Sequence, residues 1–193
     1  MADMIASPER TYTIDEFWDY AHLPENAGRR FELVNGEIRE MVPAGGEHGE
    51  IGGDFFGLIW THNKKHHLGR VTAAETGYVL GIRPDGKPDV RAPDVGFVSI
   101  ERAPKPFGSK FIPLVPDLAV EIVSPGDEAW EIEEKVLDYL RYGVRLVWVV
   151  YPASRTIISH TRDQVQRLAA DDLLDGGDVL PGFTIKVSDI FPK

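Results

Sequence analysis

The sequence predicts a domain of the α/β or α+β class, built on a mixed β-sheet flanked by helices. Two runs carry this prediction: DLAVEIVS at 117–124 and RLVWVVY at 145–151 are short, apolar and β-branched, which is typical of central strands covered on both faces. The stretch between them, about 127–142, is expected to be a helix. A length of 193 residues favours a single domain over 1–193, with its core at about 47–152.

Composition excludes several classes of protein. Hydrophobic residues make up 42% of the chain and charged residues 27%, which is typical of globular proteins rather than disordered ones. Without cysteine, the chain has no disulfide framework, no thiolate zinc site and no cysteine nucleophile. The opening MADMIASPER lacks the regions of a signal peptide, and no apolar run reaches the roughly 20 residues that span a bilayer. We therefore expect a soluble, cytoplasmic protein without a membrane partner.

The net charge of −10 argues against a protein coated in basic residues that hold nucleic acid or an anionic membrane. The charge is uneven along the chain, however. Residues 1–60 carry 4 basic and 12 acidic side chains (−8), residues 61–110 carry 9 and 5 (+4), and residues 111–193 carry 8 and 14 (−6). A local anion site in the middle third therefore stays open.

Two local signals define the N-terminal part. Thr13 and Glu16 have the spacing of a capping box ahead of an apolar pattern, which predicts the start of a helix. In the segment 30–42, RFELVNGEIREMV, the pair Asn35-Gly36 separates two alternating stretches. This pair predicts a β-hairpin with a type I′ turn, because both turn residues need positive φ.

The middle of the chain combines one long helix with strands. Apolar residues and histidines form one stripe from Glu47 to about His67, which predicts a helix. Strands are expected at about 71–82 and 92–100, separated by the turn at 84–87. A proline-rich, basic loop, RAPKPFGSKFIP at 102–113, follows.

The C-terminal part begins after the expected helix at about 127–142, which Gly143 ends as a C-cap. Beyond the strand at 145–151, residues 155–191 indicate short antiparallel strands joined by acidic turns. No repeat, low-complexity segment or linker divides the chain.

Two carboxylates stand in strands that otherwise favour burial. Asp94 begins the strand PDVGFV, and Glu121 lies in the middle of LAVEIV. A buried carboxylate needs a cation or several donors, and two carboxylates on neighbouring strands would suit Mg²⁺ or Mn²⁺. The alternative interpretation is that Asp94 caps a turn and Glu121 pairs with an arginine inside the sheet.

Lys135 is the third candidate, because the predicted helix places it on one face with Ile132 and Tyr139. A lysine returned to the strand end would polarise a water or stabilise charge on a phosphate. The alternative is an ordinary surface pair between Glu131 and Lys135 at i, i+4.

Six stretches, in this order and spacing, resemble the large family of putative restriction endonucleases expanded in cyanobacteria, a branch of the PD-(D/E)xK nuclease superfamily. The resemblance covers about residues 12–191, and EIVSP followed by EKVLDYLRYGV is its most specific part. The stretches are FELVNGEI, MVPAGGEH, APDVGFVS, PDLAVEIVSPGD, EKVLDYLRYGVRLVWVVYP and GDVLPGF.

The resemblance implies a restriction endonuclease-like core and a metal-dependent endonuclease that hydrolyses DNA phosphodiester bonds. Asp94 would be the superfamily aspartate and Glu121 the acidic member of the (D/E)xK element. Asp94, Glu121 and the carbonyl of Ile122 would hold Mg²⁺ or Mn²⁺, while Lys135 would orient the nucleophile or offset transition-state charge. A homodimer is expected, because many such nucleases cut two strands with two sites.

The chain departs from the superfamily pattern at two points. The element reads Glu121-Ile122-Val123, so the strand lysine is absent, and the resemblance implies that Lys135 on the following helix replaces it. Tyr151 stands before Pro152, where relatives often carry aspartate.

Further candidates are weaker. His48 either lines the cleft or, as a histidine on an apolar stripe, packs in the core. Glu32 and Glu75 lie in family-like segments and are candidates to complete a metal shell. The remaining histidines, His62, His66 and His67, have i, i+4 spacing but no evident third ligand, which favours a solvated helix end.

Basic residues of the middle third, Arg102, Lys105 and Lys110, are candidates to flank a phosphate path. P-loop, dinucleotide and hydrolase-elbow motifs are absent from the sequence. The alternative function is a catalytically silent, nuclease-like module that binds nucleic acid or protein, and a third possibility is hydrolysis of another phosphoester.

Overall fold

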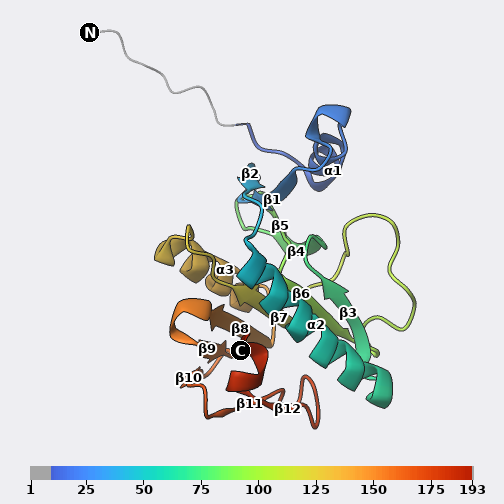
Figure 1. Ribbon diagram of the computed structural model, residues 1–193. Helices are drawn as coiled ribbons and strands as arrows, with labels where there is room; N and C mark the ends of the chain where they lie inside the picture. The colour runs from blue at the N-terminus through green and yellow to red at the C-terminus, as the bar shows by residue number, and fades with distance from the viewer. Residues whose placement is uncertain (1–9, 193) are drawn as a thin grey trace.

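A computed structural model describes residues 10–192, and its centre is a six-stranded sheet in the order β10-β9-β8-β7-β6-β3 (Figure 1). Strands β7 and β8 run parallel, whereas the other neighbours are antiparallel, so the predicted mixed sheet is confirmed. The strands are β3 (Gly69–Ala73), β6 (Val95–Ser99), β7 (Leu118–Ile122), β8 (Leu146–Tyr151), β9 (Thr156–His160) and β10 (Val165–Leu168).

A second sheet has four strands in the order β2-β1-β5-β4. Its strands are β1 (Arg30–Val34), β2 (Glu37–Met41), β4 (Tyr78–Ile82) and β5 (Pro88–Arg91). The predicted hairpin is the β1–β2 pair, and Asn35 (φ 54°) and Gly36 (φ 74°) both have the positive φ that the turn requires. The C-terminal strands β11 (Leu173–Asp175) and β12 (Thr184–Lys186) form a separate antiparallel pair.

Within residues 10–192, three α-helices accompany the sheets: α1 (Ile14–Ala21), α2 (Gly46–His66) and α3 (Ala129–Arg141). The capping box of Thr13 and Glu16 is present at the start of α1. Gly143, with φ 93°, follows the C-cap of α3, as the C-cap prediction required. Single turns of 3₁₀-helix occur at Pro24–Asn26, Pro152–Ser154 and Val187–Ile190.

Strand β7 is buried on both faces, and its alternation decides which side chain meets which helix. Leu118, Val120 and Ile122 join a hydrophobic cluster with α2 and the C-terminal segment. Ala119 joins the other large cluster, which contains residues of α3. Glu121 is two positions after Ala119, so its side chain points to the same face of the sheet, the face that α3 covers.

Two predicted strands are wrong in extent. The strand expected at 71–82 is divided into β3 and β4, which belong to different sheets, with Glu75 at φ 70° between them. The strand expected at 92–100 is β6 alone, and it begins only at Val95, after Pro93. The chain crosses from one sheet to the other at these points, and the residues on both sides of each crossing favour β structure, so local pattern does not mark the break.

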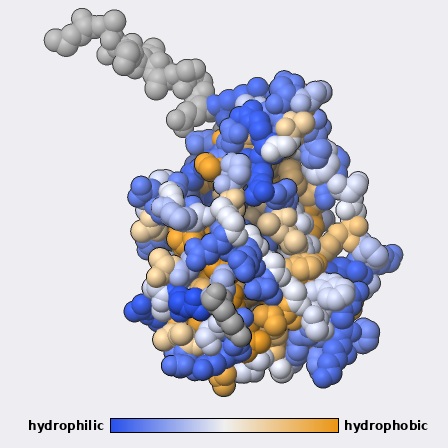
Figure 2. Space-filling view, in the orientation of Figure 1, coloured by the Kyte–Doolittle hydropathy of each residue, from blue (hydrophilic) through white to orange (hydrophobic). Residues whose placement is uncertain are grey.

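Hydrophilic side chains predominate on the face shown in Figure 2, with smaller patches of hydrophobic residues among them. Among residues 10–192, none of the helices is both long and apolar enough to cross a bilayer. The prediction of no signal peptide concerns the first ten residues, of which 1–9 lie outside the described part of the chain.

Candidate functional site

Asp94 lies immediately before β6 and is bonded to the end of β7. Its Oδ2 atom accepts a hydrogen bond from the backbone N–H of Ile122, at 2.8 Å. Continuing the register that pairs Val95 with Val120 places Pro93 opposite Ile122. Proline has no N–H, so Pro93 cannot donate to the Ile122 carbonyl and the ladder ends here. The Asp94 carboxylate accepts from the Ile122 N–H in the place that a strand carbonyl would otherwise take.

Glu121 is held by two donors from α3. Its Oε2 lies 2.8 Å from the Nζ of Lys135, and its Oε1 accepts a hydrogen bond of 2.6 Å from the hydroxyl of Tyr139. Lys135 and Tyr139 are four residues apart, so they share one helix face. The residue is 3% exposed.

The electrostatics around this carboxylate show an excess of negative charge. Burial, with the nearby charges of Asp94 and Glu32, raises the pKa of Glu121 to about 6, although Lys135 opposes the shift. Burial alone would lower the pKa of Lys135, but the charges of Glu121, Glu32 and Asp94 outweigh it and raise that pKa. Three carboxylates therefore lie around Lys135, and Arg91 is paired with only one of them, Glu32. A further cation would relieve the repulsion that remains.

Three interpretations from the sequence are settled by these contacts. Glu121 pairs with a lysine rather than with an arginine. Lys135 reaches Glu121 rather than forming the surface pair with Glu131. Asp94 bonds a neighbouring strand rather than capping a turn of its own.

His48, in the first turn of α2, extends the site. Its Nε2 lies 3.2 Å from Oδ2 of Asp94, and its side chain is 15% exposed. The hydrogen bond to Asp94 raises the pKa of His48. The interpretation of His48 as a packed core residue is therefore wrong, because its ring contacts Asp94 and is partly exposed. That His48 lines a cleft stays a prediction.

The other two carboxylate candidates differ in position: Glu32 lies beside the site and Glu75 does not. Glu32 is buried beside the site, and both its oxygens are already engaged: Oε2 by Arg91 and Oε1 by the N–H of Ala92, each at 2.9 Å. Burial would raise its pKa, but the charges of Lys135 and Arg91 and these hydrogen bonds lower it. Glu75 forms an exposed ion pair with Arg30 at 2.6 Å and has no contact with the site.

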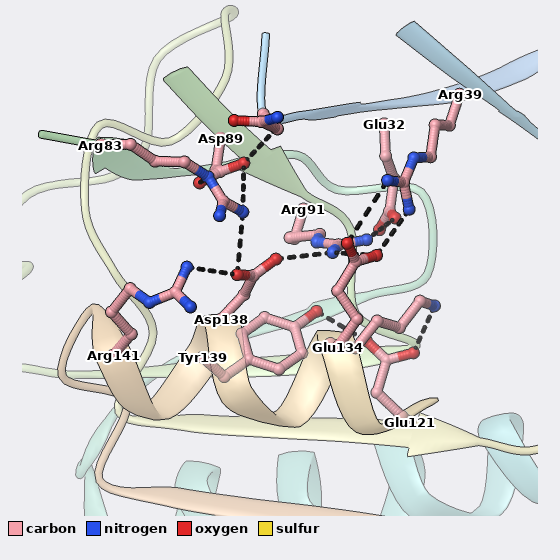
Figure 3. A network of polar contacts seen from close by, with 12 residues as sticks. Glu32, Arg39, Arg83, Asp89, Arg91, Glu121, Glu134, Asp138, Tyr139 and Arg141 are labelled. Carbon is pink, nitrogen blue, oxygen red and sulfur yellow. Dashed lines mark hydrogen bonds and ion pairs between the residues drawn. The ribbon is translucent and has the colours of Figure 1, made fainter. Parts of the chain in front are cut away.

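A network of buried ion pairs lies behind the site (Figure 3). Arg91 on β5 bonds Asp138 at 2.6 Å and Glu134 at 3.3 Å on α3, in addition to Glu32 on β1. Arg83, which directly follows β4, also bonds Asp138, at 2.9 Å. Sequence reasoning missed this network, because Asp89 and Arg91 follow the charged turn at 84–87, where exposed residues are expected.

The basic loop does not flank the site. It leaves β6 after Ser99 and returns at Leu118, at the strand ends opposite Asp94 and Ile122. Arg102 is paired with Asp117 at 2.9 Å, and Lys110 with Asp15 at 3.4 Å. The loop thus lies at the strand ends away from Asp94, and the prediction that Arg102, Lys105 and Lys110 flank a phosphate path stays a prediction.

The histidines at the end of α2 do not assemble a metal site. The rings of His62 and His66 lie 4.5 Å apart, and Nε2 of His62 is 3.0 Å from the carbonyl oxygen of Pro181. His67 terminates the helix with φ 55°. Within the described chain, no three His, Cys, Asp or Glu side chains group closely enough to hold a metal ion.

The donors around Asp94 nevertheless suit a hard divalent cation. Asp94 Oδ1 has no hydrogen bond or ion pair within residues 10–192, since both contacts of this carboxylate use Oδ2. The carboxylate of Glu121 uses two of its roughly four acceptor positions. Two carboxylates and the carbonyl of Ile122, all oxygen donors, are the ligand type that Mg²⁺ and Mn²⁺ favour.

Comparisons with known proteins agree with this fold. The family model described as "Uma2: Putative restriction endonuclease" matches residues 17–188. A crystal structure of a putative nuclease belonging to DUF820 from Anabaena variabilis ATCC 29413 superposes with a TM-score of 0.76 at 22% identity, covering 93% of this chain and 97% of that one. No curated protein matches. The structural match confirms the predicted mixed α+β fold, and the family match agrees with its assignment as restriction endonuclease-like.

Proposed function

Because the chain belongs to the Uma2 family of putative restriction endonucleases, we propose that it is a metal-dependent endonuclease that hydrolyses phosphodiester bonds in DNA. The observation that supports the proposal is the meeting of Asp94, Glu121 and Lys135 at the adjoining ends of β6 and β7. These residues come from two strands and a helix, and 41 positions separate Asp94 from Lys135 in the sequence.

In this proposal, Asp94, Glu121 and the carbonyl of Ile122 hold Mg²⁺ or Mn²⁺. When bound, the ion supplies Lewis acidity to a phosphate oxygen and lowers the pKa of a water. The local excess of negative charge around Lys135 favours such a cation, because it would offset the repulsion that raises the pKa of Glu121.

The protein's own groups have separate tasks. The N–H of Ile122 and the imidazole of His48 fix Asp94, so that its free oxygen keeps one orientation. Lys135 keeps its proton because three carboxylates surround it, and its positive charge is available to orient the nucleophile or to stabilise charge on the phosphate. These side chains are largely buried, which strengthens their electrostatic effect.

The assembly and substrate are also proposals. A homodimer would supply two sites for the two strands of a duplex. The net charge of −10 and the distance of the basic loop from the site lead us to expect weak, salt-sensitive DNA binding without the divalent ion.

Nicking of supercoiled plasmid DNA with Mn²⁺ or Mg²⁺ tests the proposal. The wild type should nick the plasmid, and Asp94→Ala and Glu121→Ala should each lose about 100-fold or more in rate. Asp54→Ala, which removes an exposed carboxylate of α2, is the matched control. Undiminished cleavage by both site variants would refute the assignment.

The second candidate function is a nuclease-like module without turnover. It is favoured by one observation, namely that no three His, Asp or Glu side chains among residues 10–192 lie close enough together to hold a metal ion. It predicts no cleavage under any metal and no Mn²⁺ binding that depends on Asp94. Activity on small phosphodiesters but not on DNA would instead indicate hydrolysis of another phosphoester.

A further inference from the structure

Tyr139 is a buried group to which neither the family match nor the proposed chemistry assigns a task. Its side chain is 0% exposed, and its hydroxyl donates to Oε1 of Glu121 at 2.6 Å. The ring packs in the cluster between α3 and the six-stranded sheet, with Ala119 and Val149 among its members. A purely apolar ring would fill this space equally well, so the hydroxyl serves the carboxylate.

The two donors of Glu121 act as a pair. Lys135 bonds one oxygen and Tyr139 the other, so each oxygen of the carboxylate has one donor on the same helix face. A single donor would leave the carboxylate free to rotate about its last side-chain bond. Two donors on different oxygens fix its plane and leave the remaining acceptor positions for another ligand.

Ion pairs on a neighbouring face of α3 fix the orientation of the helix. Asp138 and Glu134 are held by Arg91, and Asp138 is also held by Arg83 (Figure 3). These contacts join the helix to the four-stranded sheet and oppose rotation of the face that carries Tyr139. The hydroxyl therefore approaches Glu121 from a constrained direction.

We propose that Tyr139 is a positioning residue, whose hydroxyl holds the Glu121 carboxylate in the orientation that binds the divalent cation. This inference rests on the proposed function, because the divalent cation that Glu121 would bind is part of that proposal. Loss of the hydroxyl weakens cation binding, whereas turnover at saturating metal changes little.

The test uses Tyr139→Phe in the full-length protein, which keeps the packed ring and removes only the donor. Tyr142→Phe is the matched control, because the Tyr142 hydroxyl also donates to a carboxylate, that of Asp89 at 2.6 Å, one turn further along the chain. A hydrogen bond to a charged group is worth about tenfold in a binding constant. Mn²⁺ titration by calorimetry should show this loss in Tyr139→Phe and a change below about twofold in Tyr142→Phe.

Plasmid nicking separates positioning from a structural role. Tyr139→Phe should need about tenfold more Mn²⁺ for half-maximal nicking, while its rate at saturating Mn²⁺ stays within about threefold of wild type. A lower rate at every Mn²⁺ concentration, with unchanged metal dependence, would mean that the ring acts only in packing and would overturn the inference.

A readout without metal keeps the inference testable if the protein neither nicks DNA nor binds Mn²⁺. In protein labelled with ¹³C at glutamate side chains, the Glu121 carboxyl resonance should shift in Tyr139→Phe and stay in place in Tyr142→Phe. If Tyr139→Phe does not fold, a separate experiment with metal replaces this readout. The resonance of the Tyr139 hydroxyl proton is followed in the wild type during a Mg²⁺ titration, and it should shift over the same Mg²⁺ concentrations as the carboxyl resonance of Asp94. An unmoved Glu121 resonance in the first case, or an unmoved hydroxyl proton in the second, would overturn the positioning role.

Discussion

The Nζ atom of Lys135 lies 2.8 Å from Oε2 of Glu121, although one residue belongs to α3 and the other to β7. Two positions after Glu121, where a strand lysine would share its face, the chain has Val123. Helix α3 packs against that face, so a lysine of the helix reaches the carboxylate instead. The lysine thus comes from α3 instead of β7, whereas its charge pair with the glutamate is kept.

Replacing Lys135 by methionine should reduce Mn²⁺-dependent plasmid nicking by about 100-fold, because the site loses the cation that stabilises charge in the transition state. Lys64→Met, which removes a lysine from the exposed last turn of α2, should cleave at the wild-type rate. A Lys135→Met variant that cleaves as fast as Lys64→Met would contradict the role.

The equivalence of strand and helix positions predicts a rescue. Adding Val123→Lys to Lys135→Met should restore at least tenfold of the lost nicking rate, because residue 123 shares the face of Glu121. Initial rates in the two variants, normalised to folded protein, measure it. No recovery in a folded double variant would show that the lysine must come from α3.

Elements with local signals could be predicted from the sequence. The capping box of Thr13, the Asn35-Gly36 turn and the helix end at Gly143 depend on residues a few positions apart, and all three are present. The division of 71–82 between two sheets could not be predicted, because it depends on which distant strand each half pairs with.

The site residues likewise could be predicted where the signal is local and could not where it depends on packing. Asp94 and Glu121 stand out because carboxylates are costly in apolar strands. The destination of Lys135 is a matter of how α3 packs on the sheet, and only the resemblance to a known family indicated it. Tyr139 and Arg91 left no signal of their roles, since an aromatic residue on a helix and an arginine on a strand are usually ordinary structural residues.

Asp94→Asn should remove the stabilisation that Mn²⁺ gives to the folded protein. At a Mn²⁺ concentration of 100 times Kd, binding adds about 2.7 kcal/mol to the free energy of unfolding, or a Tm increase of about 5–10 °C for a chain of this size. Asp54→Asn, on the exposed side of α2, should keep the full increase. Thermal unfolding with and without Mn²⁺ measures both, and an equal increase in Asp94→Asn would exclude Asp94 as a ligand.

Mn²⁺ affinity should depend on pH through Glu121. Its pKa is raised from 4.5 to about 6, so the protonated carboxyl group stabilises the metal-free fold below pH 4.5, and this contribution is lost as the pH rises through about 6. Mn²⁺ requires the ionised form, so Kd should increase about tenfold per pH unit below about 6 and be constant above about 7. Calorimetry between pH 5 and 8 tests this dependence.

A control separates Glu121 from the neighbouring imidazole. The pKa of His48 is also raised, by its hydrogen bond to Asp94, so protonated His48 would oppose metal binding as well. In His48→Gln the pH at which Kd begins to rise should stay near 6, if Glu121 controls it. A shift of that pH to about 4.5 in His48→Gln would assign the dependence to the histidine instead.

The buried network should contribute more to stability than its exposed edge. Arg91→Met leaves the buried carboxylates of Glu32 and Asp138 without their shared cation, so the free energy of unfolding should fall by about 3–5 kcal/mol. Arg39→Met removes the exposed partner of Glu134 and should cost less than about 1 kcal/mol. Urea unfolding at pH 7 measures both variants.

A double-mutant cycle shows whether the cost of Arg91→Met arises from the charge that it leaves behind. In Arg91→Met with Glu32→Gln, one stranded carboxylate is neutral, so the double variant should be at least about 1 kcal/mol more stable than the sum of the single effects predicts. Volume lost at Arg91 would instead give additive effects, because packing at position 91 is independent of the charge on Glu32. Additivity within about 0.5 kcal/mol would therefore mean that Arg91 stabilises the protein by filling space between α3 and the four-stranded sheet.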